Sequence, residues 1–383
     1  MKIDTQLIHT GEPQPRIDGA VSMPIFQTAM YEDGDDDLRY IRYNNTPNQE
    51  VLNRKLAALE EAEAALVTGS GMAAISTALL SVLTPGDHLL AQAGLYGGTH
   101  SFVTRVLPDL GIDVDFIDAD APETWEAPLR PTTRAVYVES ITNPLMQVGD
   151  LEAVAAFAQA HGLVSLIDNT FATPVNFRPA AWGFDLSLHS ATKYLNGHSD
   201  IVAGAVVGAG VLIARVAKKL KHFGGSLDPH ACFLLHRGMK TLALRVRYQN
   251  ESALHLARFL EAHPLVRTVN YPGLETHPQH ERARRLFDGF SGMLSVEMAG
   301  GQAATERFLH HLTVPILAPS LGGVESLATR PAATSHVDLT PEERRHLGIT
   351  DSLIRLSVGI EATDDLIADF EQALEALEEV ALS

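Results

Sequence analysis

The stretch that decides the fold runs from residue 163 to residue 200 and reads LVSLIDNTFATPVNFRPAAWGFDLSLHSATKYLNGHSD. Segment 163–167 is apolar throughout and 185–189 is a weaker segment of the same kind, and both predict short buried strands. The first strand ends at Asp168, and the second leads into a loop with Lys193 at its centre. Ligands of open α/β sheets bind beyond the carboxyl ends of the strands, so Asp168 and Lys193 are candidate site residues.

Strands and helices alternate around this stretch, which predicts an α/β fold with a mostly parallel sheet covered on both faces. Asp150 and Gly162 suit the start and the end of a helix between them, and Asp228 followed by proline suits the start of a later, long helix. Further strands are expected at 88–91, 112–117, 135–139, 201–208, 292–297 and 352–358, and helices at 51–66, 72–83, 151–160, 228–262 and 363–381.

Composition places the chain among globular proteins and limits its partners. Its 383 residues are 45% hydrophobic and 20% charged. Its apolar runs are far shorter than the roughly 20 residues of a membrane-spanning helix, so we expect no membrane partner. The net charge of −18 repels phosphate backbones and argues against nucleic acid as a partner. The single cysteine, Cys232, excludes a disulfide scaffold and a cysteine-based zinc site and favours a cytoplasmic location.

Lys193 is one of seven lysines and the only one in a predicted sheet-edge loop among small hydroxyl residues. A lysine amine serves as a covalent catalyst when it forms a Schiff base with an aldehyde, which pyridoxal phosphate supplies. That cofactor also needs a carboxylate to keep its pyridine nitrogen protonated, donors for its phosphate, and an aromatic ring to stack on.

The sequence offers candidates for all three requirements. Asp168 is the candidate carboxylate, and Tyr96, in LYGGT, is the candidate stacking ring. Residues 68–72, TGSGM, precede a predicted helix, so their backbone N–H groups could cradle a phosphate, with hydroxyls added by Ser190 and Thr192.

These patterns also have plainer interpretations. An aspartate after a strand is commonly a helix cap, and the GSG at 69–71 is common in tight turns. A dinucleotide-binding oxidoreductase would need GxGxxG, but Met-Ala-Ala follows Gly71 and the third glycine is missing. A metal hydrolase could use some of the 17 histidines, yet no HExxH occurs. A non-catalytic binding module would require that Lys193 carries no cofactor.

Five motifs together carry a family resemblance: TGSGMAAI at 68–75, YGGT at 96–99, SLIDNTFATP at 165–174, SATKYLNGHSD at 190–200 and SLGGVESL at 320–327. With these motifs in this order, the chain resembles the cystathionine γ-synthase and γ-lyase family over nearly its whole length. These are the fold-type I pyridoxal-phosphate enzymes of cysteine and methionine metabolism.

The resemblance implies an aspartate-aminotransferase-like fold with three parts. We expect an N-terminal arm at 1–50, a large pyridoxal-phosphate-binding domain at 51–245 and a smaller α+β C-terminal domain at 246–383. The family's usual assembly is a homotetramer, a dimer of catalytic dimers. Tyr40 and Arg42, in the arm, match the family's Tyr-x-Arg motif and would reach the phosphate in a neighbouring subunit's site.

The resemblance also assigns roles by position. Lys193 would be the Schiff-base lysine and would carry protons between Cα, Cβ and Cγ of the substrate. Asp168 would hold the pyridinium, and Tyr96 would stack on the ring and assist proton transfer. The remaining assignments are Gly71, Met72, Ser190 and Thr192 for the phosphate, Asn143 and Arg355 for the substrate α-carboxylate with Ser320 beside it, and Glu139 as support for the cofactor.

The sequence departs from the cystathionine enzymes at two positions. Arg39 stands where they often have an acidic residue, and Ser101 stands where they often have arginine, so both changes argue against cystathionine itself. Methionine γ-lyases characteristically have cysteine at the position of Gly98. Glu325, in SLGGVESL, favours the cystathionine group over the sulfhydrylases and is expected to contact substrate.

We therefore expect a carbon–sulfur lyase that performs γ-elimination on a sulfur amino acid, of the cystathionine or methionine γ-lyase type. Its products would be a keto acid, ammonia and a thiol. The alternative is γ-replacement on an O-acylated homoserine, of the cystathionine γ-synthase or sulfhydrylase type.

Overall fold

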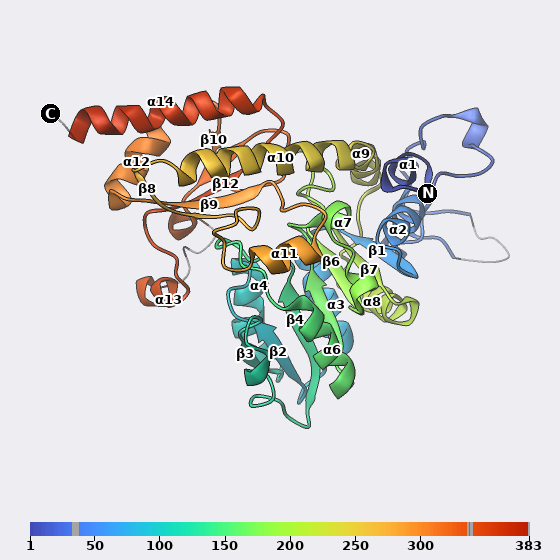
Figure 1. The fold of residues 1–383 in the computed structure, drawn as a ribbon. Coiled ribbons are helices and arrows are strands. Elements are labelled where there is room, and N and C mark those ends of the chain that lie inside the picture. Colours follow the sequence, from blue (N-terminus) through green and yellow to red (C-terminus); the bar gives the residue numbers. More distant parts are fainter. Residues whose placement is uncertain (33–37, 335–336, 338–339, 382–383) are drawn as a thin grey trace. The chain divides into compact units, whose positions relative to one another are not determined.

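The computed structural model describes residues 1–32, 38–334, 337 and 340–381, and the chain forms two compact units (Figure 1). The first unit comprises Met1–Ala93, Thr99–Ser140 and Gly149–Ala243. The second comprises Gly94–Gly98, Ile141–Val148 and Leu244–Ser383. The predicted division into an arm, a cofactor domain and a C-terminal domain stays a prediction.

A seven-stranded sheet forms the centre of the first unit, in the order β1-β7-β6-β5-β4-β2-β3. The strands from β6 to β3 in that order are parallel, and β7 is antiparallel to both of its neighbours. The prediction of a mostly parallel sheet is confirmed. The strands are β1 Ala64–Thr68, β2 His88–Gln92, β3 Asp113–Ile117, β4 Thr133–Glu139, β5 Val164–Asp168, β6 Leu186–His189 and β7 Gly204–Gly208.

Helices pack around this sheet, and the caps that the sequence predicts for α6 and α9 are present. The Asp150 carboxylate accepts the Ala153 N–H at the start of α6, and Gly162 ends that helix in the left-handed region at φ 64°. The Asp228 carboxylate caps α9 in the same way. The helices are α1 Ile3–His9, α2 Pro47–Leu59, α3 Gly71–Val82, α4 Gly97–Ser101, α5 Leu107–Asp109, α6 Leu151–His161, α7 Thr173–Asn176, α8 Gly210–Phe223 and α9 Pro229–Met239.

The predicted helix at 51–66 is wrong in its second half. Helix α2 ends at Leu59, Glu61 has a φ of 56°, and the alanine-rich segment that follows is strand β1. Every residue of β1 pairs with β7. Alanine and leucine favour a helix in isolation, but this ladder of hydrogen bonds and the burial of Ala65–Thr68 decide for a strand.

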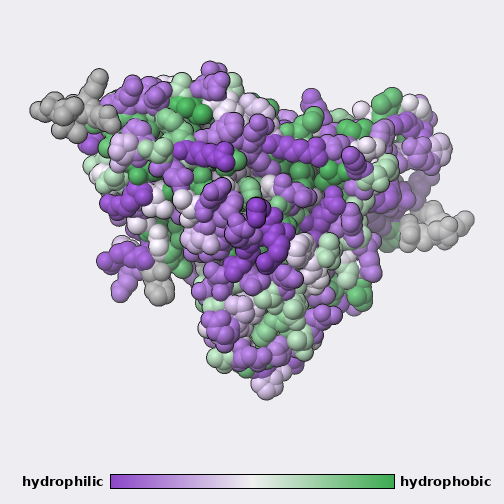
Figure 2. Space-filling model, viewed as in Figure 1, coloured by the Kyte–Doolittle hydropathy of each residue, from purple (hydrophilic) through white to green (hydrophobic). Residues whose placement is uncertain are grey.

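The second unit contains a five-stranded sheet in the order β10-β11-β12-β9-β8, packed against helices. The apolar faces of α10, α12 and α14 share one core with β9 and β12. Figure 2 shows that the visible face of the molecule is mostly polar. The elements are α10 Leu242–Glu261, β8 Val266–Asn270, α11 His280–Leu286, β9 Met293–Met298, α12 Gly301–His311, β10 Ile316–Leu317, β11 Leu327–Thr329, α13 Pro341–His346, β12 Leu353–Ser357 and α14 Thr363–Ala381.

The single helix predicted at 228–262 is wrong, because the structure has two helices, α9 and α10. The amides of Lys240 and Thr241 bond to carbonyls three residues back, at Arg237 and Gly238, which tightens the last turn of α9 and interrupts the α-helical ladder. Gly238 also lies so close to the Asn196 carbonyl oxygen that a Cβ would sit 2.2 Å from it. Among the described residues, none of the helices has both the length and the apolar character needed to cross a membrane.

A buried charged cluster holds the N-terminal segment against α2 and α9. Glu12 Oε1 lies 2.9 Å from His236 Nε2 and 3.4 Å from Lys240 Nζ. Lys55 Nζ donates to the Leu7 carbonyl at 2.7 Å. Burial, assisted by the charge of Lys55, lowers the pKa of His236 to about 4. His236 is therefore neutral in the folded protein at pH values where it is charged in the unfolded chain.

We predict that stability falls as the pH drops from 6.5 towards 4. In this window the unfolded chain binds more protons than the folded one. Each such histidine therefore lowers the free energy of unfolding by up to about 1.4 kcal/mol for every pH unit of acidification. Burial also lowers the pKa of His277, to about 4, and that of His88, so His236→Gln should remove about a third to a half of this slope. Urea unfolding at several pH values measures it, with the exposed His255→Gln as control. An unchanged slope in His236→Gln would contradict the prediction.

Candidate active site

The carboxyl ends of β4, β5 and β6 lie side by side at one edge of the first sheet. Glu139 pairs in register with Asp168, and Asp168 pairs with Leu188, which places His189 one step further along β6. Asp168 is buried, and its carboxylate accepts the Thr170 N–H at 2.9 Å. Burial raises the pKa of Asp168, while hydrogen bonds from Thr170 and the charge of His189 act in the opposite direction.

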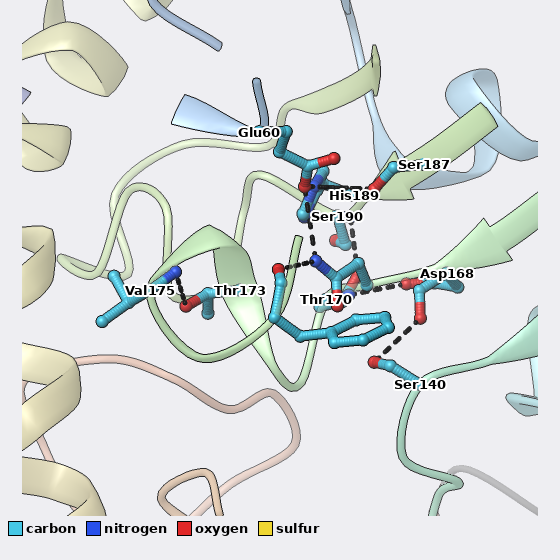
Figure 3. A network of polar contacts seen from close by, with 11 residues as sticks. Glu60, Ser140, Asp168, Thr170, Thr173, Val175, Ser187, His189 and Ser190 are labelled. Carbon is cyan, nitrogen blue, oxygen red and sulfur yellow. Dashed lines mark hydrogen bonds and ion pairs between the residues drawn. The ribbon is translucent and has the colours of Figure 1, made fainter. Parts of the chain in front are cut away.

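The loop after β6 is fastened to the end of β5. Ser190 N–H donates to Thr170 Oγ1 at 2.8 Å, so Thr170 contacts both Asp168 and the start of the loop (Figure 3). Lys193 N–H donates to the Ser190 carbonyl, which shapes the first turn of the loop. The structure therefore brings the loop that carries Lys193 to the strand end that carries Asp168.

The start of α3 lies directly against Ser190. A Cβ on Gly71 would sit 2.8 Å from Ser190 Cβ and 2.9 Å from its hydroxyl, so only glycine permits this approach. Ser70 caps the helix by accepting the Ala73 N–H at 3.0 Å. The first N–H groups of a helix favour an anion, and here they adjoin a serine. Met72 follows Gly71 in the first turn.

Thr192 is engaged with Ala203, the residue directly before β7. Its hydroxyl accepts the Ala203 N–H at 3.0 Å and donates to the Ala203 carbonyl at 3.1 Å. A hydroxyl has one hydrogen to donate, so Thr192 would have to turn this hydrogen from Ala203 to serve a phosphate.

The arm residues lie at the end of α8. Arg42 Nη1 donates to the Lys221 carbonyl at 2.8 Å, and its guanidinium lies 5.3 Å from the ring centres of Tyr40 and Tyr43. Within this chain, Arg42 thus donates a hydrogen bond to a carbonyl of the last turn of α8. The contact of Tyr40 and Arg42 with a neighbouring subunit stays a prediction.

In the second unit, the buried Arg355 contacts two other predicted residues, the buried Asn143 and the half-buried Ser320. Arg355 lies on β12, between β9 and β11, and is 5% exposed. Its Nη1 donates to Asn143 Oδ1 at 3.2 Å and its Nη2 to the Ser320 carbonyl at 2.8 Å. Glu325 is half-buried just before β11, and Tyr96 is 42% exposed in the segment Gly94–Gly98.

Sequence reasoning missed two buried residues at the edge of the first sheet, Glu60 and His189. Glu60 lay inside the predicted helix at 51–66, where a glutamate is ordinarily a surface charge, so the sequence contains no signal for its burial. His189 ends a buried strand directly before Ser190, and a titratable residue in that position is a usable signal. Across the part of the chain that the structure describes, no group of three or more His, Cys, Asp or Glu residues could hold a metal ion.

The residues of the first unit fit the cofactor that the sequence predicts. Asp168 supplies a buried carboxylate, and the close contact between Gly71 and Ser190 supplies N–H and hydroxyl donors at a helix start. The loop that carries the Lys193 amine is joined to both through Ser190 and Thr170. Together these residues provide the three features that pyridoxal phosphate needs: an acceptor for a protonated ring nitrogen, a site for the phosphate anion and a primary amine.

Comparison with known proteins gives one consistent result. Residues 4–375 match the family model described as Cys/Met metabolism PLP-dependent enzyme. The chain is 42% identical to a cystathionine gamma-lyase of Bacillus subtilis over 98% of its own length and 100% of the relative's. It is 40% identical to the chloroplastic cystathionine gamma-synthase 1 of Nicotiana tabacum, over 97% of its own length and 71% of the relative's.

A solved structure, cystathionine gamma-lyase from Lactobacillus plantarum complexed with L-serine, has a similar fold. Its TM-score is 0.95 at 38% identity, over 99% of this chain and 100% of that one. The predicted α/β fold of the fold-type I class is thereby confirmed.

We predict that Gly71→Ala destabilises the first unit, because the new methyl would overlap Ser190. An overpacked site of this kind costs about 1–3 kcal/mol. The matched control is Gly210→Ala, at the start of α8, where a Cβ would meet only the flexible end of Glu63 at 3.3 Å. Thermal unfolding compares the two, and equal melting temperatures for both variants would refute the expectation.

Proposed function

Because the chain belongs to the Cys/Met metabolism PLP-dependent enzyme family, we propose that it catalyses γ-elimination on a sulfur amino acid. The products are a keto acid, ammonia and a thiol. The observation that carries the amino-acid substrate is the buried Arg355, which is held by Asn143 and Ser320. The similarity to a cystathionine gamma-lyase along its entire length supports elimination.

The first unit would hold the cofactor. Bound pyridoxal phosphate supplies an electron-withdrawing ring that makes the substrate Cα proton acidic. Lys193 would hold the cofactor through its Nζ and would carry the proton among Cα, Cβ and Cγ of the substrate. Asp168, when ionised, would keep the ring nitrogen of the cofactor protonated, and Glu139, its neighbour on β4, would support the cofactor. Tyr96 would stack on the ring and assist proton transfer.

The phosphate of the cofactor would bind at the start of α3. The N–H groups of Gly71 and Met72 point along the first turn of this helix, where an anion is favoured. The Ser190 hydroxyl adjoins Gly71 and adds a donor. Thr192 adds a second hydroxyl when its hydrogen turns from Ala203.

Arg355 would hold the substrate α-carboxylate. A guanidinium binds a carboxylate through charge-assisted hydrogen bonds, and Asn143 and the Ser320 carbonyl fix its orientation before substrate arrives. Glu325 contributes to the same substrate region of the second unit.

Arg39 bears on the choice of substrate. It lies 3.8 Å from Glu50, and its side chain is 42% exposed, so its charge is only weakly compensated. A positive arm residue disfavours a substrate with a distal ammonium, which argues for sulfur amino acids other than cystathionine. Ser101, a small hydroxyl residue in α4, provides no charge for a distal carboxylate.

The second candidate is γ-replacement, in which a thiol adds to an O-acylated homoserine. It is favoured by the nearly equal similarity of the chain to a cystathionine gamma-synthase of Nicotiana tabacum. For either reaction we propose a homotetramer built from two catalytic dimers, in which Tyr40 and Arg42 complete the phosphate site of the neighbouring subunit.

Steady-state assays separate the two reactions. We predict that a keto acid and ammonia form from methionine, homocysteine or cystathionine without an added thiol, with methionine or homocysteine preferred over cystathionine. O-Succinyl- and O-acetylhomoserine are assayed with cysteine or sulfide. A thioether or thiol amino acid formed faster than any keto acid would establish replacement instead, and no turnover of any of these substrates would contradict both.

We predict that Arg355→Ala raises KM about 10- to 150-fold, because a hydrogen bond to a charged group contributes about 1.5–3 kcal/mol. The visible absorption of the bound cofactor should remain unchanged, since Arg355 is assigned to the substrate alone. Arg267→Ala is the matched control, because this arginine of β8 is exposed and pairs with Glu297 at 3.6 Å. A KM within twofold of the control would refute the role of Arg355.

A further inference from the structure

Glu60 is a carboxylate buried completely at the end of α2, at 0% exposure. His189 Nε2 donates to its Oε1 at 2.5 Å, and Ser187 Oγ donates to the same oxygen at 3.1 Å (Figure 3). Asn169 Nδ2 also donates to this oxygen, at 3.3 Å. A carboxylate withdrawn from water is costly unless charge and hydrogen bonds compensate it. Glu60 Oε1 thus accepts three hydrogen bonds, two from residues of β6 and one from the residue that follows β5.

These donors adjoin the residues proposed for the cofactor. Asn169 follows Asp168 directly, and its backbone N–H donates to the Leu188 carbonyl at 2.8 Å. Its side chain also donates to the Phe177 carbonyl at 2.9 Å. His189 directly precedes Ser190 at the end of β6. One carboxylate on α2 therefore links the end of β5, with Asp168, to the start of the loop that contains Lys193.

The pKa values of the groups at the ends of β4 and β5 also depend on the charges around them. Asp168 is buried, and the charge of His189 opposes the rise in the pKa of Asp168 that burial causes. Burial and the charges of Asp168 and Glu139 raise the pKa of Tyr137, the titratable neighbour on β4. The hydrogen bond to Glu60 requires a proton on Nε2 of His189 and fixes the plane of its ring.

We infer that Glu60 is a positioning residue for the cofactor: through Asn169 and His189 it fixes the two strand ends that carry Asp168 and the Lys193 loop. This inference rests on the roles of Asp168 and Lys193 proposed above. The chain contains a chemically similar pair for comparison, Glu12 and His236, which is also buried but ties the N-terminal segment to α9.

The experiment uses Glu60→Gln, which keeps the shape of the side chain and removes its charge. Two quantities are measured on the full-length protein: the affinity of the stripped enzyme for pyridoxal phosphate, and the midpoint of the pH titration of the bound cofactor's visible absorption. We expect an affinity at least about 10-fold weaker, as when supporting hydrogen bonds of a metal site are removed, and a shifted midpoint.

The matched control is His236→Gln, which removes the other buried histidine–glutamate contact. It should lower the melting temperature about as much as Glu60→Gln does, while leaving both cofactor measurements at the wild-type values. A merely structural role of Glu60 predicts that the two variants behave alike. Wild-type affinity and midpoint in Glu60→Gln would overturn the inference.

Asp168→Asn separates this inference from the proposed function. If Asp168→Asn alters affinity and midpoint but Glu60→Gln does not, only the role of Glu60 is wrong; if neither does, the cofactor assignment itself is wrong. Should Glu60→Gln fail to fold, Ser187→Ala replaces it, because it removes only one hydroxyl that donates to Glu60. It should weaken cofactor affinity about 2- to 10-fold, and wild-type behaviour would again overturn the inference.

Discussion

The parallel register of β4, β5 and β6 is the constraint on which the rest of the first unit depends. Backbone hydrogen bonds align Glu139 with Asp168 and Asp168 with Leu188, so the chain leaves all three strands at one edge of the sheet. Any polar residue just beyond these ends must lie beside its neighbours from the other strands. The site residues of this unit lie together at that edge because the hydrogen-bonded register of the three strands fixes where each strand ends.

This arrangement concentrates carboxylates where little water reaches them. Asp168, Glu139 and Glu60 are each less than a tenth exposed, and bringing such charges together is unfavourable unless partners compensate them. The structure supplies backbone and hydroxyl donors and one imidazole, that of His189, which contacts Glu60 and opposes the effect of burial on Asp168. An ionised Asp168 is what a protonated cofactor ring requires, so the same compensation serves the fold and the chemistry.

The second unit applies the same principle with the opposite charge. Arg355 lies in the middle of a sheet, where a guanidinium is costly, and it donates to the Asn143 side-chain amide oxygen and to the Ser320 carbonyl. These two contacts fix the orientation of the guanidinium, which is what the proposed recognition of a substrate carboxylate needs.

The sequence by itself determined the features that depend on a few neighbouring residues. The apolar strand before Asp168, the caps at Asp150 and Gly162, and the terminal helix all agree with the structure, because periodicity and capping act over one or two turns. The five motifs, taken together and in order, likewise identified the family, because each of them is a run of contiguous residues.

Only the tertiary structure decided the features that depend on distant partners. Strand β1 exists because β7 pairs with it, which outweighs its helical composition. Glu60 contacts His189 across 129 positions of sequence, and Arg355 contacts Asn143 across 212. Local sequence gives no information about such pairs, since whether a charged side chain is buried and compensated is set by whatever the fold packs against it.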